Sequence, residues 1–530
     1  MNIRSDLSWL LVLLISLAVF LPGLGAYPLL DPDEGRNAQV ALEVVRDGHW
    51  LPPTLNGKTR YQKPPLYYWL VASTFLLIGP GEFAARLPSA LAALIGVWVT
   101  LLLGTRLWGR EKGCLAALLQ ATSLIYVSYA HIVIFDMVLT SFILASLLFL
   151  WKALEEGKKR DWALASLFVA LAFLTKGPVG MVIPLMTFLP VLLYKSLVDK
   201  ERISIPWPLV ILVFLLIAAP TFVLAELREP GYCYHFFWEE NVLRYLTPRF
   251  HRGAPFYYYL PVILLGLLPW TFLLPSALRK LQELWRLYPH RTLLLASWIL
   301  LPTIFFTLSK SKMPHYILPT FPAWALLIAG TWKENQIFPF KLIPPVLIAY
   351  LLVFMVAMPI YSKRKSAAFA VSLMVKNDST PLYTYKAEKR YSLAFYSGKK
   401  IRNFKSVEEL KNALDSVSKA YVLTKREKLA SILALSPPYS LKVLGTSPKL
   451  VLVEIENPFL HSSTPPKNPT TAGELRGQGN FWVRCCIDCQ PLNPPWLTIF
   501  ISTFIDRMGN EQKLPGRRNP SHLLRFPPFF

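Results

Sequence analysis

Acidic residues gather directly after the first long apolar stretch of this 530-residue chain. The segment Asp31–Arg36 holds Asp33, Glu34 and Arg36, and it runs into an amphipathic helix expected to end near Asp47. Carboxylates at the edge of an apolar stretch are commonly solvated loop charges. Three acids and one arginine within six residues favour a second reading, in which Asp33 and Glu34 face a catalytic site at a lipid boundary.

A lysine between polar and apolar sequence offers a second candidate. Lys63 precedes Pro64 and Pro65, which fix the direction of the chain before a short apolar helix. One interpretation is an anchoring lysine that reaches the headgroup region. The other is a contact with a phosphate group.

Two further ionisable residues stand at the ends of apolar stretches. Asp136 opens the run Met137–Trp151, and Lys176 occupies a break between two apolar segments. An acid among apolar neighbours usually faces a polar cavity. Both residues are predicted to lie on the same membrane side as Asp33.

Two outer segments add positive charge. Phe236–Tyr245 contains Arg244 and is followed by Arg249, His251 and Arg252, while Ser309–Tyr316 contains Lys310 and Lys312. Arginine suits phosphate oxygens because its N–H groups form a planar fork. We therefore expect these segments to meet an anionic partner such as a lipid phosphate.

The composition shows what must position these residues. The chain is 53% hydrophobic and only 17% charged, which excludes an ordinary soluble enzyme. A net charge of +24 would suggest nucleic acid in a soluble protein. Here the basic residues lie between apolar stretches, so we expect anionic lipid headgroups as the partner and no binding of nucleic acid.

The apolar stretches predict an all-α polytopic membrane protein with about eleven transmembrane helices and additional external helices. The first is expected to be a retained span rather than a cleaved signal peptide. With a cytoplasmic N-terminus, the basic loops fall inside. The stretch Pro64–Ile78 is too short to cross and predicts an interfacial helix. The expected spans cover residues 7–25, 86–108, 113–131, 136–153, 162–177, 179–196, 207–225, 256–279, 291–309, 315–332 and 340–361.

The chain divides into three predicted parts. Residues 1–361 form the transmembrane catalytic domain, and 362–457 form a small external α/β domain. The tail, 458–530, is rich in proline and is expected to lack structure. The domain prediction rests on strands at Leu382–Tyr385, Ala420–Thr424 and Leu450–Ile455 and on helices at Val407–Leu414 and Arg426–Leu435.

Two conspicuous features receive an ordinary interpretation. Cys485, Cys486 and Cys489 lack a placed fourth ligand, so we expect no zinc site there. His131, at the end of an expected span, is predicted to be packed rather than catalytic.

Five motifs in order resemble the aminoarabinose transferase branch of the membrane GT-C glycosyltransferases, which is related to protein O-mannosyltransferases. The resemblance covers about residues 1–330. The motifs are Asp33-Glu34-Gly35-Arg36, Gln62-Lys63-Pro64-Pro65-Leu66-Tyr67-Tyr68-Trp69, Ala85-Arg86-Leu87-Pro88-Ser89, Leu174-Thr175-Lys176-Gly177-Pro178 and Ser309–Pro319.

The resemblance implies an enzyme of the bacterial inner membrane, and a single attack on the face opposite the lipid phosphate would invert the anomeric centre. The enzyme would move a sugar from undecaprenyl phosphate, on the periplasmic face, to lipid A or a similar acceptor. By the same resemblance Asp33 and Asp136 are the family's two acids, while the acid cluster itself makes Glu34 a third catalytic candidate. The expected donor phosphate contacts are Lys63, Arg244, Tyr316 and Arg36.

The chain departs from the family at two positions tied to a divalent metal. Gln62 stands where the family commonly has glutamate, and Asn241 where it has histidine. Side-chain amides are weak zinc ligands. We therefore predict no metal and no cofactor, with His251 as the substitute ligand should one be found.

In the expected mechanism, Lys63 and Arg244 stabilise the charge on the departing lipid phosphate. Asp33 acts as general base toward a hydroxyl acceptor, or orients a phosphate acceptor that needs no base. Two alternatives remain: an enzyme like a protein O-mannosyltransferase, with a protein acceptor, and a lipid-binding or transport protein without catalysis. The chain lacks the Trp-Trp-Asp signature of oligosaccharyltransferases.

Overall fold

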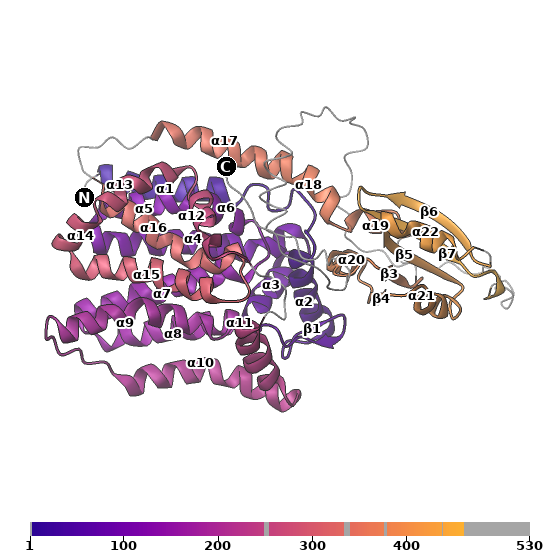
Figure 1. Ribbon diagram of the computed structural model, residues 1–530, viewed down its shortest axis with the longest axis horizontal. Coiled ribbons are helices and arrows are strands. Elements are labelled where there is room, and N and C mark those ends of the chain that lie inside the picture. The colour runs from indigo at the N-terminus through magenta and orange to yellow at the C-terminus, as the bar shows by residue number, and fades with distance from the viewer. Residues whose placement is uncertain (1–2, 248–253, 333–339, 376–378, 437, 461–530) are drawn as a thin grey trace, which may run out of the picture.

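The computed structural model describes residues 3–247, 254–332, 340–375, 379–436 and 438–460. A large bundle of helices carries a small sheet domain at one end (Figure 1). The predicted tail lies outside the described residues from position 461 onward, and so does its cysteine cluster.

Among the described residues, six helical segments are long and apolar enough to cross a membrane. They are α4 (Glu82–Trp108), α7 (Phe135–Glu156), α9 (Val179–Leu197), α10 (Trp207–Arg228), α15 (Pro289–Leu308) and the stretch Ile343–Lys365, made of α17 (Ile343–Leu352), η7 (Val353–Ala357) and α18 (Met358–Lys365). The chain is thus a multi-pass membrane protein.

Two predicted spans are not straight helices. Residues 113–131 fall in α5 (Arg110–Ala121) and α6 (Leu124–Ala130), which meet at 63°. Residues 256–279 fall in Phe256–Gly266 and Trp270–Arg279, which meet at 105°. These segments comprise η3 (Phe256–Tyr258), α12 (Tyr259–Gly266), η4 (Trp270–Leu273) and α13 (Leu274–Arg279). Counting each bent pair as one span gives up to eight.

The two breaks lie against each other, which explains how they are tolerated. The backbone N–H of Leu124 donates to the carbonyl of Leu268 at 2.8 Å, and Trp270 Nε1 donates to Thr122 Oγ1 at 2.8 Å. Each break therefore supplies hydrogen-bond partners for polar groups of the other break. In apolar surroundings such groups must be satisfied within the protein. Each of the two predicted spans is thus occupied by a bent pair of helices.

Helices also occupy the three remaining predicted spans. These are α1 (Ile3–Phe20), α8 (Lys159–Lys176) and η5 (Pro314–Thr320) continued by α16 (Phe321–Gly330). They are shorter or more charged than the six spans above, so the count of eleven stays a prediction.

Short elements form a platform between the bundle and the sheet domain. They are α2 (Asp33–Asp47), the hairpin of β1 (Thr54–Leu55) and β2 (Lys58–Thr59), α3 (Leu66–Ile78), η1 (Tyr234–Leu243) and α11 (Arg244–Leu246). The apolar face of α2 is buried through Val40, Ala41 and Val44. With 13 residues, α3 is a short apolar helix, in line with the expected interfacial element.

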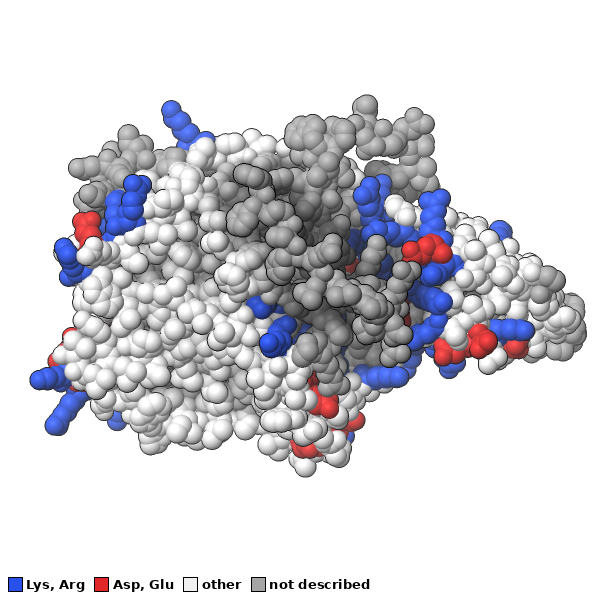
Figure 2. Space-filling view, viewed as in Figure 1, with Lys and Arg blue, Asp and Glu red and all other residues white. Residues whose placement is uncertain are grey.

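Charged side chains mark the two ends of the bundle. On the face drawn in Figure 2, lysines and arginines gather at the end far from the sheet domain and again where that domain begins. A broad uncharged belt separates them. This is the distribution expected of a helical bundle set in a bilayer.

The sheet domain has five strands in the order β4-β3-β5-β7-β6. Strand β3 pairs in parallel with β4 and β5, while β7 pairs antiparallel with β5 and β6. The strands are β3 (Leu382–Tyr385), β4 (Arg402–Phe404), β5 (Lys419–Lys425), β6 (Ser440–Thr446) and β7 (Leu450–Glu456). The helices are α19 (Ala368–Ser372), α20 (Tyr391–Ser397), α21 (Val407–Leu414) and α22 (Leu429–Leu433), and η8 (Arg426–Lys428) and η9 (Pro458–Leu460) are single 3₁₀ turns.

A further short helix, α14 (Leu281–Leu287), precedes α15 in the bundle.

Candidate active site

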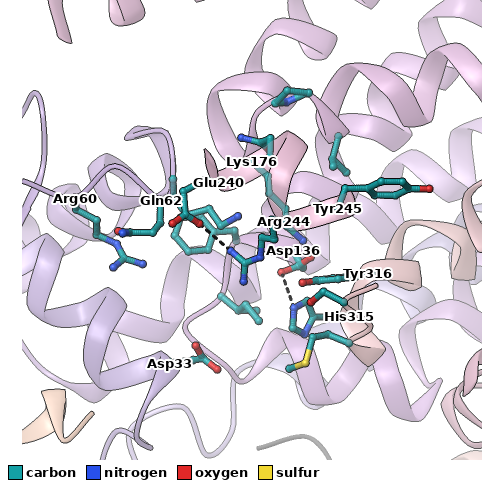
Figure 3. A pocket seen from close by; sticks show the side chains of 18 of the residues that line it. Asp33, Arg60, Gln62, Asp136, Lys176, Glu240, Arg244, Tyr245, His315 and Tyr316 are labelled. Atoms are coloured by element: carbon teal, nitrogen blue, oxygen red, sulfur yellow. Dashed lines mark hydrogen bonds and ion pairs between the residues drawn. The ribbon is translucent and has the colours of Figure 1, made fainter. Parts of the chain in front are cut away.

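A cavity of about 950 Å³ lies where the platform meets the ends of α7 and α8. Six of the seven expected site residues line it, and Glu34 does not. The six are Asp33, Arg36, Lys63, Asp136, Arg244 and Tyr316. Segments far apart in the sequence therefore converge on one chamber (Figure 3).

Three cations share this chamber. Lys63 comes from the loop before α3, Lys176 from the last turn of α8, and Arg244 from the start of α11. Burial, followed by the positive charges of Arg244 and Lys176, lowers the pKa of Lys63 well below its usual value. Such mutual repulsion is relieved when an anion enters, so this side of the cavity suits a phosphate group.

Asp136 is the buried acid of the cluster. Its carboxylate forms an ion pair with Lys176 and lies 3.8 Å from Nε2 of His315. The Nζ of Lys176 also lies 4.7 Å from the centre of the Tyr316 ring. These contacts join Asp136, Lys176 and Tyr316 in one wall of the cavity.

Asp33 stands at a different part of the cavity. Figure 3 shows it apart from the pair of Asp136 and His315. It forms an ion pair with Arg36 one turn along α2, and the Arg36 guanidinium lies 5.9 Å from the ring of Tyr391. Because Tyr391 opens α20, the sheet domain contributes directly to the surroundings of Asp33.

The sheet domain is fastened to the platform beside this point. The backbone N–H of Ser392 donates to Asp31 Oδ1 at 2.8 Å, and the Ser392 hydroxyl donates to the same carboxylate. The hydroxyl of Tyr396 donates to Glu82 at 2.8 Å. These bonds fix α20, and with it Tyr391 and Lys389, at the cavity wall.

Glu34, an expected catalytic residue, has a structural position instead. Its side chain is 2% exposed and accepts hydrogen bonds from Nε and Nη2 of Arg86, each at 2.8 Å. It also accepts from the backbone N–H groups of Leu30 and Val133. All its acceptor capacity thus joins the first loop to α4 and to the segment before α7, so we no longer assign it to catalysis.

A π-helix brings two polar residues to the cavity. Glu240 and Asn241 lie in η1, a ten-residue π-helix, and such helices often occur at functional sites. Asn241 donates its amide to the carbonyl of Phe236 at 2.7 Å, while Glu240 accepts from Arg244 at 3.3 Å.

These residues do not fit a divalent metal. Gln62 and Asn241 offer amides, and the nearby Glu240 is engaged by an arginine. Within the described residues no group of three or more His, Cys, Asp or Glu side chains could hold a metal ion. The absence of a metal stays a prediction, since His251 lies outside the described residues.

The remaining expected residues are placed as follows. His131 is fully buried, with its ring nitrogens near the carbonyls of Val127 and Pro22, which confirms the packed role. Lys310 and Lys312 are absent from the cavity wall. Arg249 and Arg252 lie outside the described residues.

Sequence reasoning did not single out several residues that line the cavity. Arg60 stands three residues before Lys63, so its position beside a candidate phosphate lysine was an available signal. His315 lies within a motif already quoted. Lys389 and Tyr391 carry no local signal, because only the docking of α20 brings them to the cavity.

The amino-acid sequence is similar to those of known membrane glycosyltransferases. Residues 62–223 match the family described as dolichyl-phosphate-mannose-protein mannosyltransferase. An undecaprenyl phosphate-α-4-amino-4-deoxy-L-arabinose arabinosyl transferase of Aeromonas hydrophila is 34% identical over 69% of this chain and 70% of its own length. The Aeromonas salmonicida enzyme of the same name is 36% identical over 61% of this chain and 59% of its own.

Solved structures share the fold. The crystal structure of ArnT from Cupriavidus metallidurans bound to undecaprenyl phosphate has a TM-score of 0.72 at 22% identity, covering 86% of this chain and 99% of that one. The Archaeoglobus fulgidus oligosaccharyltransferase has a TM-score of 0.51 at 11% identity, covering 80% and 70%. The GT-C architecture predicted from the sequence is thus confirmed, and the chain belongs to the aminoarabinose transferase family of membrane glycosyltransferases.

Proposed function

We propose that this enzyme transfers 4-amino-4-deoxy-L-arabinose from undecaprenyl phosphate to lipid A or a similar lipid acceptor, with inversion at the anomeric carbon. The observation that carries the proposal is the convergence of Lys63, Lys176 and Arg244 in one cavity beside the buried Asp136. The names of the Aeromonas relatives supply the sugar and the lipid carrier.

The cations act on the leaving group. As the bond from the sugar to the lipid phosphate breaks, the phosphate gains charge, reaching roughly −1.5 to −2. Lys63 and Arg244 contact its oxygens, and their positions are set before the reaction, so the charge is stabilised without reorganisation. Tyr316 borders the same wall through its contact with Lys176.

The two acids have separate roles. Asp136 orients Lys176 through their ion pair. Asp33, paired with Arg36 and set apart from Asp136 in Figure 3, acts on the acceptor in this proposal. It serves as a general base toward a hydroxyl, or orients an acceptor that is already ionised.

The cavity opens toward the periplasm in this proposal. The basic loops between the apolar segments fall on the opposite side when the positive-inside rule is applied. The platform, the cavity and the sheet domain then share the outer face of the bacterial inner membrane.

Transfer from a labelled donor tests the proposal. Purified protein is incubated with labelled undecaprenyl phosphate aminoarabinose and, separately, with lipid A or with a protein acceptor. We expect label on lipid A, complete loss of transfer in Asp33→Asn, and normal transfer in the control Asp47→Asn, which changes an exposed acid at the other end of α2.

Other outcomes separate the alternatives. Label on the protein acceptor alone would favour an enzyme like the protein O-mannosyltransferases. Donor binding without turnover under every condition would favour a lipid-binding or transport protein. Wild-type turnover by Asp33→Asn would remove Asp33 from the mechanism.

A further inference from the structure

His315 is a titratable residue of the cavity that the mechanism proposed above does not use. It is the second residue of η5 and lines the cavity, and its side chain is 13% exposed. Figure 3 shows the imidazole beside Tyr316, with Nε2 at 3.8 Å from the carboxylate of Asp136. His315 therefore borders the same wall as the residues assigned to the leaving phosphate.

Ionisable groups reach His315 from several helices, and one of them is a carboxylate. Helix α15 meets η5 through the apolar Phe306, and α16 carries no ionisable residue. The ionisable neighbours of η5 and of His315 are Asp136 of α7, Tyr129 of α6, Tyr259 of α12, Tyr316 of η5 itself and Lys176, which α8 places against Asp136 and Tyr316. Asp136 is the carboxylate of this set, and it would balance the charge of an imidazolium at position 315.

The formal charges of the leaving-phosphate wall match the donor but not the departing group. Lys63, Lys176 and Arg244 provide three positive charges. Two of these are offset by the paired carboxylates Asp136 and Glu240, so a single positive charge remains. A phosphodiester donor carries one negative charge, whereas the departing monoester reaches roughly −1.5 to −2. One additional proton at this wall would restore the balance.

We propose that His315 is the proton donor to the departing undecaprenyl phosphate and that Asp136 orients it for this role. This inference rests on the proposed function and deepens it by assigning the proton of the leaving group. Histidine suits the role because its side chain gains and loses a proton near neutral pH. Asp136 uses separate oxygens for its two neighbours, Oδ1 for Lys176 and Oδ2 for His315.

The proton moves together with the breaking bond. As the bond between the anomeric carbon and the donor phosphate oxygen breaks, its electron pair leaves with that oxygen. The proton of the His315 imidazolium passes to an oxygen of the same phosphate, so the lipid phosphate departs with one negative charge and the imidazole becomes neutral. The acceptor oxygen forms the new bond to the anomeric carbon. A proton from water recharges His315 after the lipid phosphate has left.

The pH dependence of transfer tests this role. Wild-type kcat should fall as the pH rises through the range in which histidine titrates, about pH 6 to 8, because the imidazolium is lost. His315→Asn should lower kcat about a hundredfold near pH 6. The ratio of wild-type to variant kcat should shrink toward one as the pH rises. Because the acceptor and the sugar titrate equally in both proteins, this ratio isolates the contribution of His315.

Two comparison variants accompany His315→Asn. His49→Asn changes an exposed histidine that lies after α2 and outside the cavity, so it should keep the wild-type kcat and pH profile. Tyr316→Phe removes the neighbouring phenol, and it should retain the fall in kcat above about pH 6 because the imidazole is still present.

Binding of undecaprenyl phosphate without a sugar gives a measurement that needs no turnover. Near pH 7.5 the free lipid phosphate is mostly doubly charged and a free histidine is mostly neutral, since their pKa values are about 6 and about 6.5. Calorimetric titration of the full-length protein in nanodiscs, in two buffers with different heats of ionisation, counts the protons taken up. Wild type should take up about half a proton to one proton more per bound lipid than His315→Asn. Proton uptake by Lys63, whose pKa is lowered in the empty cavity, is common to both proteins and cancels in this difference.

The outcomes distinguish this inference from the proposed function. Normal transfer by wild type, with equal proton uptake in wild type and His315→Asn, would overturn the inference and leave the function standing. A loss of kcat in His315→Asn that is the same at every pH would assign His315 a structural role and also overturn it. Loss of the alkaline fall in Tyr316→Phe, with the fall kept in His315→Asn, would move the proton to the phenol. Proton uptake that requires His315, in a protein that transfers no sugar to any acceptor, would instead overturn the function and support the pairing of His315 with the lipid phosphate.

Discussion

Gly35 lies where α2 meets α20, and replacing it by alanine should disturb the site through the sheet domain. A Cβ at this position would lie 2.5 Å from the backbone nitrogen of Ser392 and 2.6 Å from Oδ1 of Asp31. Carbon contacts are normally about 3.5–4.0 Å, so α20 would have to withdraw by about 1 Å. The atoms in the way are also joined by the hydrogen bond that docks α20.

The magnitude follows from that displacement. Overpacking typically costs about 1–3 kcal/mol, and misplacing site groups by 1 Å can slow a reaction about a hundredfold. Without the contact, alanine would instead stabilise the helix by about 0.5–1 kcal/mol relative to glycine. The sign of the change in stability therefore shows whether α20 is held against α2.

The assay for Gly35→Ala combines melting temperature with steady-state transfer. We expect a lower melting temperature and a kcat/KM reduced by about tenfold to a hundredfold, chiefly through the acceptor KM. Gly81→Ala is the control, because no atom lies within 4 Å of its added Cβ. A Gly35→Ala enzyme as active and at least as stable as the control would refute the view that α20 is held against α2 as part of the site.

Two further predictions concern buried carboxylates of the platform. Burial raises the pKa of Asp31 to about 6, so the folded state favours the protonated carboxyl and stability should rise as pH falls from about 6 to about 4. Asp31→Asn should flatten this rise in thermal unfolding. An unchanged dependence of stability on pH in Asp31→Asn would contradict the prediction. Glu34→Gln leaves the fully buried Arg86 without its counter-ion and should destabilise the protein by about 3–5 kcal/mol, measured by denaturant unfolding. An unfolding curve like that of wild type would show that the ion pair is dispensable.

The sequence was most informative where one physical signal dominates. The run Met137–Trp151 is apolar and falls within α7, and the β-rich run at Leu382–Tyr385 coincides with β3. Hydropathy could not locate the breaks at Thr122 and Pro269, because these depend on hydrogen bonds between two distant segments.

Two strands of the sheet domain also escaped prediction. Strand β6 contains Lys442, is largely exposed at the sheet edge, and has a register shift between Val443 and Gly445 that interrupts its alternation. Strand β4 has only three residues. Short or irregular edge strands carry too little periodicity to be recognised.

For the candidate site, the chemical type of a residue was a better guide to its function than its place in the sequence. Lys63 and Asp136 were expected from charge at the ends of apolar segments and Arg244 from positive charge in an outer loop, and all three line the cavity. The same reasoning misassigned Glu34, because nothing in the local sequence shows that Arg86 claims its carboxylate. The part played by Lys389 depends on tertiary docking and has no local signature.

The affinity for undecaprenyl phosphate without a sugar tests the central claim most directly. Each charge-assisted contact contributes about 1.5–3 kcal/mol, so Lys63→Ala and Arg244→Ala should each weaken binding by about tenfold to a hundredfold. Arg244→Lys should recover only part of the loss, since lysine lacks the bidentate fork. Lys310→Ala, at an exposed position outside the cavity, should bind as wild type. Wild-type affinity in both Lys63→Ala and Arg244→Ala, with weakened binding in Lys310→Ala, would contradict the account and move the phosphate site to the loop at Ser309–Tyr316.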